Sequence, residues 1–223
     1  MTPVLRLVAG LVLLAAYHHY LLPPTASPVE AAPLTDRAIL RDIDASEMAY
    51  SAGRFEDALE PTLRLTGKMP SQAMYFNRLA SIYRELGRHS DEARSWEGVF
   101  AVSATPVDAC PMLGQAYEAA HETTRAIGAF ERCLEVDPDN PDAMLYLGRA
   151  YQGVGRGADA RRVLEKGLAL APGYSDLYLL LGVRNYLDGR IDVARQQFER
   201  FLELSPERRY EVQTWIDRTE PKR

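Results

Sequence analysis

An internal repeat limits how this chain can fold more than any other feature of its sequence. Alanine recurs at a constant step in Ala126, Ala160 and Ala194. Proline, glycine and a large apolar residue recur at the same step: Pro138, Pro172, Pro206; Gly114, Gly148, Gly182; and Phe130, Leu164, Phe198. A fixed period of about 34 residues indicates tandem structural units that stack on one another and share a continuous core.

Each unit has the apolar spacing of two amphipathic helices joined by a turn, for example over 142–153 and 157–170. Beyond residue 35, Ala, Leu, Arg and Glu dominate, and no alternating run rich in Val, Ile and Thr is present. We therefore expect an all-α body. Gly148 is expected where two helices cross, since it lacks a side chain, and Gly155 in the turn, where a positive φ is often needed.

These units resemble the tetratricopeptide repeat family, whose signature is W-x2-L-G-x2-Y, then A-x3-F and P, within a unit of about 34 residues. One unit reads Met144-x2-Leu147-Gly148-x2-Tyr151, then Ala160-x3-Leu164 and Pro172. Two further units have Cys110 and Tyr178 at the first signature position, and in the second of these the tyrosine, Tyr186, falls one place late. The resemblance covers roughly residues 36–218 and implies a right-handed superhelical solenoid of helix hairpins.

About five units are expected over 35–206, the first of them degenerate. The second reads Phe76-x2-Leu79-Ala80-x2-Tyr83, followed by Gly87 and Ala93, so its turn is predicted to hold one extra residue, with Trp96 filling the gap that this shift opens. In the first unit, four small or polar residues replace the first-helix signature: Asp42, Ala45, Ser46 and Ala49. Terminal repeats are commonly atypical in this way.

Residues 207–219 are predicted to form a capping helix. Val212, Trp215 and Ile216 follow helical spacing and can cover the apolar end of the stack. Ser205 is a candidate N-cap, and Pro206 suits the first helical position.

The N-terminus differs from the body. Residues 1–22 include an apolar run over 4–22 whose one charge is Arg6, and a Pro-rich linker follows over 23–34. Such a run can be an uncleaved membrane anchor, a signal peptide cleaved after Val29-Glu30-Ala31, or a buried helix. Because Arg6 and the α-amino group lie at the start of this segment, and the first charges after it are Glu30 and Asp36, we expect a single-pass protein whose C-terminal domain is extracytoplasmic, that is periplasmic.

No residue pattern indicates an enzyme, and we expect no catalytic residues, cofactor or metal. The chain has no Gly-rich phosphate loop ending in Lys-Ser/Thr, no H-E-x-x-H and no G-x-S-x-G. His89 and His121 both fall at predicted turns. A net charge of −5 argues against nucleic acid as the main partner, and no small-molecule substrate is expected.

Cys110 and Cys133 hold the fourth and twenty-seventh positions of one unit, which face each other across a helix pair. A disulfide needs Cα atoms within about 7 Å, whereas packed helix axes lie about 8–10 Å apart. A bridge and two packed thiols therefore both stay open.

The resemblance implies that a protein or peptide partner binds a concave groove lined by the first helices. Family positions 2, 5, 9 and 12 point into that groove. The candidate residues are Asn77, Arg84, Gln115, Arg149, Gln152, Leu179, Val183 and Tyr186. Pro111 and Leu145 stand where members that clamp a C-terminal carboxylate require Lys. The apolar end, from Leu179 to Tyr186, either binds an apolar segment or is covered by the terminal helix.

The sequence thus predicts a non-catalytic, membrane-tethered scaffold that assembles envelope proteins on the extracytoplasmic side. Two alternatives stay open: a soluble secreted or periplasmic binding module released by signal cleavage, and an accessory subunit of an enzyme.

Overall fold

The computed structural model describes residues 37–103 and 109–219, which contain helices and turns and no strand. Of these residues, 37–41 belong to the first compact unit of the chain, and those from Asp42 onward belong to the second. Of the first unit only residues 37–41 are described, so the predicted anchor and linker lie outside the described residues. The helices are α2 (Arg37–Ser51), α3 (Phe55–Lys68), α4 (Ala73–Glu85), α5 (His89–Val102), α6 (Ala109–Ala119), α7 (Thr123–Val136), α8 (Pro141–Gly153), α9 (Gly157–Leu170), α10 (Ser175–Leu187), α11 (Ile191–Leu204) and α12 (Arg209–Thr219).

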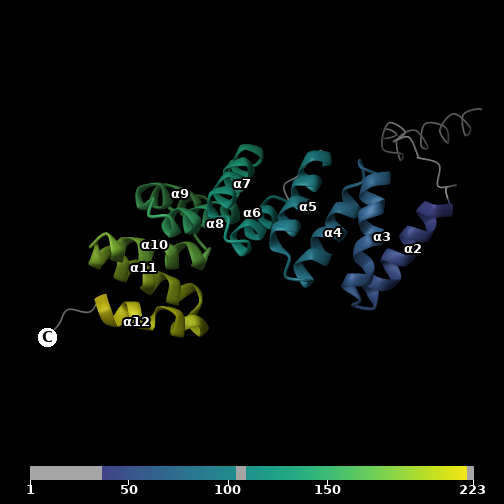
Figure 1. Cartoon of the computed structure of the whole chain (residues 1–223). Coiled ribbons are helices and arrows are strands. Elements are labelled where there is room, and N and C mark those ends of the chain that lie inside the picture. Colours follow the sequence, from purple (N-terminus) through teal and green to yellow (C-terminus); the bar gives the residue numbers. More distant parts are fainter. Residues whose placement is uncertain (1–36, 104–108, 220–223) are drawn as a thin grey trace, which may run out of the picture. The chain divides into compact units, whose positions relative to one another are not determined.

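Consecutive helices pair as hairpins, and each hairpin packs on the next (Figure 1). Within hairpins, α4 packs on α5, α6 on α7, α8 on α9 and α10 on α11. Between hairpins, α5 contacts α6, α7 contacts α8 and α9 contacts α10. The first helices of successive hairpins also contact each other, α6 with α8 and α8 with α10. The predicted solenoid of helix hairpins is therefore confirmed.

The close approach predicted at the repeated glycines is present inside each of the three later hairpins. A Cβ added at Gly114 would lie 2.2 Å from the ring of Phe130. Added at Gly148 it would lie 2.5 Å from Leu164, and at Gly182 it would lie 2.5 Å from Phe198. Phe130, Leu164 and Phe198 are fully buried. Each glycine thus makes room for the large side chain of its own hairpin partner, and we call this contact the glycine seam.

The turns between paired helices also behave as the period predicts. Gly155 adopts φ +77°, and Gly189 adopts φ +74°. At the equivalent place in the α6–α7 turn, His121 has φ +60°, the one positive φ of a non-glycine residue in the described chain. These residues allow a left-handed turn of constant length between the two helices.

The predicted extra residue in the α4–α5 turn is wrong. Gly87 has the same positive φ as the other turn glycines, and the amide of Glu92 donates to the carbonyl of Arg88. Ala160 makes the equivalent bond to Arg156. The turn therefore keeps its length, and Glu92, not Ala93, stands at the position where the other units have alanine.

Trp96 consequently fills no gap opened by an insertion. It stands one repeat period before Phe130, at the large apolar position of its unit, and packs half-buried against the core around Ala93 and Leu113. The register of the second unit is thus the same as that of the third.

The terminal helix continues the period for half a unit. Val212 and Ile216 stand one repeat period after Tyr178 and Gly182, and Val212 is fully buried with Phe198 and Phe201. Ile216 replaces the seam glycine, which is acceptable because no further helix packs on α12 in the described residues. Ser205 makes no side-chain cap, and Pro206 begins a short 3-10 turn before α12 rather than α12 itself.

Candidate functional site

The predicted groove residues lie on the first helices of successive hairpins. Asn77 and Arg84 are exposed on α4, Gln115 is half-buried on α6, and α8 carries exposed Arg149 and half-buried Gln152. All five are polar, and none belongs to the buried core. We call these five residues the polar first-helix surface.

The apolar end of the predicted groove is packed against α12. Leu179, Val183 and Tyr186 are half-buried in the cluster that contains Trp215 and Ile216. The rings of Tyr186 and Trp215 meet edge-to-face with centroids 5.3 Å apart. Tyr186 therefore contacts the terminal helix of its own chain, and Leu179 and Val183 belong to the same apolar cluster. The polar residues are the more accessible part of the predicted groove.

Arg84 is held by a buried carboxylate that the sequence analysis missed. Its Nε donates to Oε1 of Glu92 at 2.6 Å, and the Glu92 side chain is only 4% exposed. Nδ1 of His89 lies 3.1 Å from the other carboxylate oxygen, and the indole N–H of Trp96 lies 3.5 Å from the first. Glu92 stands five residues after the turn glycine, where every other unit with a turn glycine has alanine, and this spacing was the signal that could have found it.

Arg149 and Gln152 contact the neighbouring hairpins. Nη2 of Arg149 lies 2.5 Å from Oε2 of Glu118 on α6, and its guanidinium lies 5.1 Å from the ring centre of Tyr146. Gln152 donates from Nε2 to the carbonyl of Leu180 at 3.0 Å. Because both side chains are held by neighbouring groups, they lose less conformational entropy when a partner binds.

Cys110 and Cys133 are brought together as predicted, in one buried cluster with Ala143. Both are free thiols in this structure. Burial raises the pKa of each thiol, and the neighbouring cysteine raises the pKa of Cys133 further. A raised pKa lowers the thiolate fraction, so neither cysteine is suited to act as a nucleophile. The disulfide itself stays a prediction.

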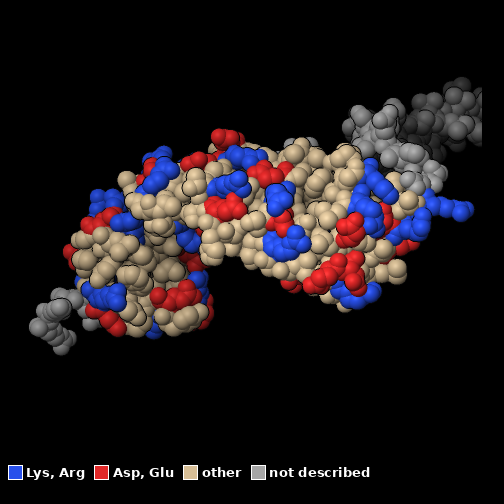
Figure 2. All heavy atoms as spheres, in the orientation of Figure 1, with Lys and Arg blue, Asp and Glu red and all other residues tan. Residues whose placement is uncertain are grey.

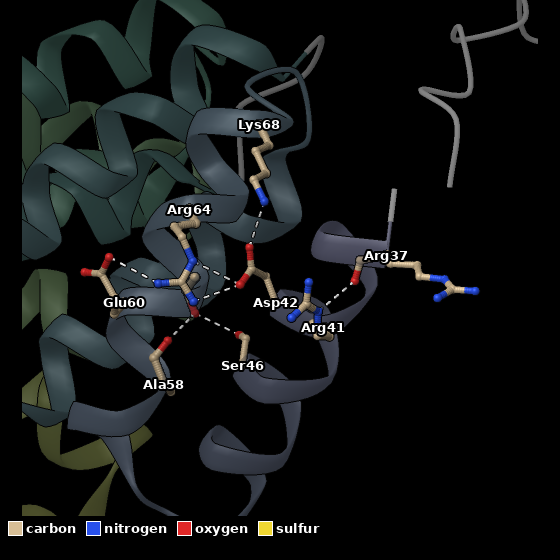
Figure 3. Close-up of polar contacts among 9 residues, drawn as sticks. Arg37, Arg41, Asp42, Ser46, Ala58, Glu60, Arg64 and Lys68 are labelled. Carbon is tan, nitrogen blue, oxygen red and sulfur yellow. Dashed lines mark hydrogen bonds and ion pairs between the residues drawn. The ribbon is translucent and has the colours of Figure 1, made fainter. Parts of the chain in front are cut away.

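A polar cluster joins the two helices of the first hairpin (Figure 3). Asp42 on α2 accepts from Nη2 of Arg64 at 2.8 Å and from Nζ of Lys68 at 3.1 Å. The hydrogen bond from Arg64 is the main cause that lowers the pKa of Asp42. One turn further along, the hydroxyl of Thr62 donates to the carbonyl of Ala58 and accepts from Ser46 at 2.8 Å. These groups are satisfied by one another, which is typical of a structural cluster.

The described residues also bear on metal sites, membrane spans and basic patches. No group of three or more His, Cys, Asp and Glu side chains that could hold a metal ion lies among them. No helix there is long and apolar enough to span a bilayer. On the face shown in Figure 2, acidic and basic side chains are interspersed rather than gathered into one large basic patch.

Comparison with known proteins gives a family match and several similar structures. The sequence model of the tetratricopeptide repeat matches residues 117–183. No curated protein sequence matches the chain significantly.

Among solved structures, a MamA protein has a TM-score of 0.65 at 23% identity, with 78% of this chain and 94% of that chain covered. The fold is that of a tetratricopeptide repeat solenoid. MamA from Desulfovibrio magneticus RS-1 gives a TM-score of 0.64 at 17% identity and covers 77% of this chain and 97% of that chain. YrrB, described as a TPR protein with an unusual peptide-binding site, gives 0.64 at 15% identity and covers 79% of this chain and 91% of that chain.

Proposed function

We propose that this protein is a non-catalytic tetratricopeptide repeat scaffold that binds a protein partner on its polar first-helix surface. The observation that carries the proposal is the contrast along the first helices. Asn77, Arg84 and Arg149 are exposed on α4 and α8, whereas the three apolar groove residues of α10 are half-buried in the cluster that includes Trp215 of α12. The accessible part of this face is therefore polar and, at its arginines, held in place by acidic neighbours.

The chemistry of this surface favours an extended, polar partner segment. Asn77, Gln115 and Gln152 carry amides that can donate to backbone carbonyls and accept from backbone N–H groups. Nε of Arg84 donates to Glu92 and Nη2 donates to Sδ of Met112 at 3.5 Å, which leaves three of the five guanidinium N–H groups for a partner's carbonyl or carboxylate. An extended peptide presents such groups at regular intervals, as it does in other peptide-recognition modes.

The finer part of the proposal is membrane tethering. Residues 4–22 would anchor the chain, the Pro-rich linker 23–34 would act as a spacer, and the repeats would assemble envelope complexes on the extracytoplasmic side. Mass spectrometry of the mature chain decides between anchor and signal peptide. Peptides that contain Leu5, found in carbonate-washed membranes, support the anchor, whereas a mature N-terminus at Ala32 and release from membranes support the soluble alternative.

Site-specific photocrosslinking in intact cells tests the partner surface. A benzoylphenylalanine at Asn77 on α4 should crosslink to a discrete partner, and the same probe at Gln115 should capture the same protein. Glu165 provides the matched control, because it is exposed on α9, a second helix that does not belong to the polar first-helix surface.

The yield of the Asn77 crosslink should also depend on Arg84, which is held in place by Glu92. Arg84→Gln should reduce the crosslink from Asn77, because it removes the fixed guanidinium about two turns further along α4. Equal crosslinking from Glu165, or a yield unchanged by Arg84→Gln, contradicts the proposed surface. A partner that proves to be the catalytic chain of an enzyme would assign the accessory-subunit role.

A further inference from the structure

Three crevices open between the second helices of successive hairpins. They lie between α3 and α5, between α5 and α7, and between α7 and α9, with volumes of about 170, 540 and 310 Å³. Tyr83, Tyr117 and Tyr151, which occupy the same position of their units, line one crevice each. The three crevices are therefore repeats of one feature and can be compared directly.

Their linings differ in charge. The first and third crevices are lined partly by aliphatic or aromatic side chains. Each also has equal numbers of acidic and basic residues: Asp91 and Arg94 in the first, and Glu131, Glu135, Arg162 and Lys166 in the third. The middle crevice has no large aliphatic side chain. Its lining is Arg94, Glu97, Tyr117, Arg125, Gly128, Ala129 and Arg132, so three arginines stand against one glutamate.

The three arginines are each positioned by a carboxylate of their own chain. Nη1 of Arg132 lies 3.0 Å from both oxygens of Glu97, and its guanidinium lies 4.1 Å from the ring centre of Phe100. Arg125 pairs through Nη1 with Glu122 at 2.8 Å, and Arg94 pairs through Nη2 with Asp91 at 2.5 Å.

Among the described residues, each of these pairs uses one nitrogen of its guanidinium group. The other two nitrogens can donate to a ligand. The guanidinium fork matches the oxygens of carboxylates and phosphates, and several forks around one space select a multiply charged anion. Gly128 and Ala129 add little bulk to the lining, and the volume falls within the range of small-molecule sites.

We propose that the crevice between α5 and α7 binds a small, multiply charged oxyanion that carries two or more phosphate or carboxylate groups. Arg125 and Arg132 bind the anion from α7, and Arg94 binds it from α5. Glu97 opposes binding by its charge, while it also holds Arg132 in place. This site lies on the second helices, so it is separate from the polar first-helix surface and does not depend on the proposed partner.

Isothermal titration of the purified full chain with pyrophosphate tests the proposal, with citrate as a carboxylate probe and acetate as a singly charged control. Arg125→Gln should weaken pyrophosphate binding by up to about fivefold, the size expected for one exposed ion pair. Arg162→Gln is the matched control, since both arginines lie on a second helix, are exposed by 67% and 77%, and pair with an acid three residues earlier in the chain. It should leave binding unchanged.

Glu97→Gln gives a result of opposite sign. It removes the one negative charge from the lining, so binding of pyrophosphate should tighten by about threefold at low salt and less at high salt. A merely structural role for Glu97 predicts no tightening. Absence of binding in the wild type, equal weakening by Arg125→Gln and Arg162→Gln, or acetate bound as tightly as pyrophosphate would overturn the proposal. An acidic partner segment bound there instead would show as binding of oligoglutamate but not of pyrophosphate.

Discussion

The first hairpin and the later hairpins use the same positions of the repeat to hold their helices together, but with different chemistry. Between α8 and α9, Gly148 accepts the buried side chain of Leu164. At the equivalent positions between α2 and α3, Ser46 and Thr62 are hydrogen-bonded at 2.8 Å. Where the α8–α9 hairpin has buried Met144, the first hairpin has Asp42 paired with Arg64 and Lys68.

The repeat geometry therefore depends on the register more than on the chemistry of the seam. Both hairpins form, yet their stabilities should respond to different variables. A glycine seam depends on volume, because its contact is van der Waals packing. We call Asp42, Ser46 and Thr62 of the first hairpin, with their partners, the polar seam. Its stability depends on charge and pH, because a carboxylate and two hydroxyls hold the helices together there.

The largest effect is expected from Phe130→Ala, which deletes a fully buried ring from the glycine seam of α6 and α7. Such truncations cost about 3–5 kcal/mol of unfolding free energy. Thr62→Ala, at the equivalent position of the first hairpin, should cost about 1 kcal/mol, the net contribution of a hydrogen bond. Urea unfolding followed by circular dichroism measures both. Equal losses would show that the two seams do not differ.

A smaller effect is expected from Gly148→Ala. The new Cβ would lie 2.5 Å from Leu164, so the helices must shift, at a cost of about 1–3 kcal/mol for overpacking. Gly67→Ala is the control, because a Cβ at this helical position meets nothing within 4 Å. It should stabilise the protein by up to about 1 kcal/mol through helix propensity. Destabilisation by both changes would argue against the close approach.

Asp42→Asn should cost about 2 kcal/mol at neutral pH, because it weakens hydrogen bonds between charged groups. The pKa of Asp42 is lowered below its ordinary value of 3.8, mainly by the hydrogen bond from Arg64. A lowered pKa stabilises the folded state above the ordinary value, and that contribution is lost as the pH falls through the folded pKa. The difference between wild type and variant should therefore be constant from pH 5 to 7, about one to three units above that value, and shrink below about pH 4. A difference that grows in acid contradicts the ion pair.

The smallest effect on the stability of a hairpin is expected at the cysteine pair of α6 and α7. If Cys110 and Cys133 are the two packed thiols of this structure, both should react with a thiol reagent after denaturation without reductant. In the folded protein they should react slowly, because burial raises the pKa of both. No titratable thiol in the denatured, unreduced chain would show that the disulfide forms instead.

Much of the fold could be predicted because the period is visible in residue types that have one structural reason. The pair of Gly148 and Leu164 has a counterpart in the unit before it and in the unit after it, and only a close helix crossing explains a small and a large residue at those two places. The turn glycine Gly155 is equally informative, because a positive φ excludes most other residues.

The rest could not be predicted, because a side chain can change while the backbone keeps its register. Glu92 stands at an alanine position, and the neighbouring Ala93 suggested an insertion that does not exist. The sequence left open whether α12 would cover Leu179 and Tyr186, since that depends on packing between segments far apart in the chain. The arginines of the middle crevice come from two separate helices and follow no motif.

The decisive measurement for the two kinds of seam is hydrogen exchange by mass spectrometry on the wild type and Asp42→Asn at pH 7, about three units above the ordinary pKa of Asp42. In a repeat stack each unit contacts only its neighbours, so a local loss of stability should stay local. We expect faster exchange in α2 and α3 and unchanged protection in α8 and α9. Equal acceleration throughout the chain, or none in the first hairpin, would contradict a polar seam that acts on its own hairpin.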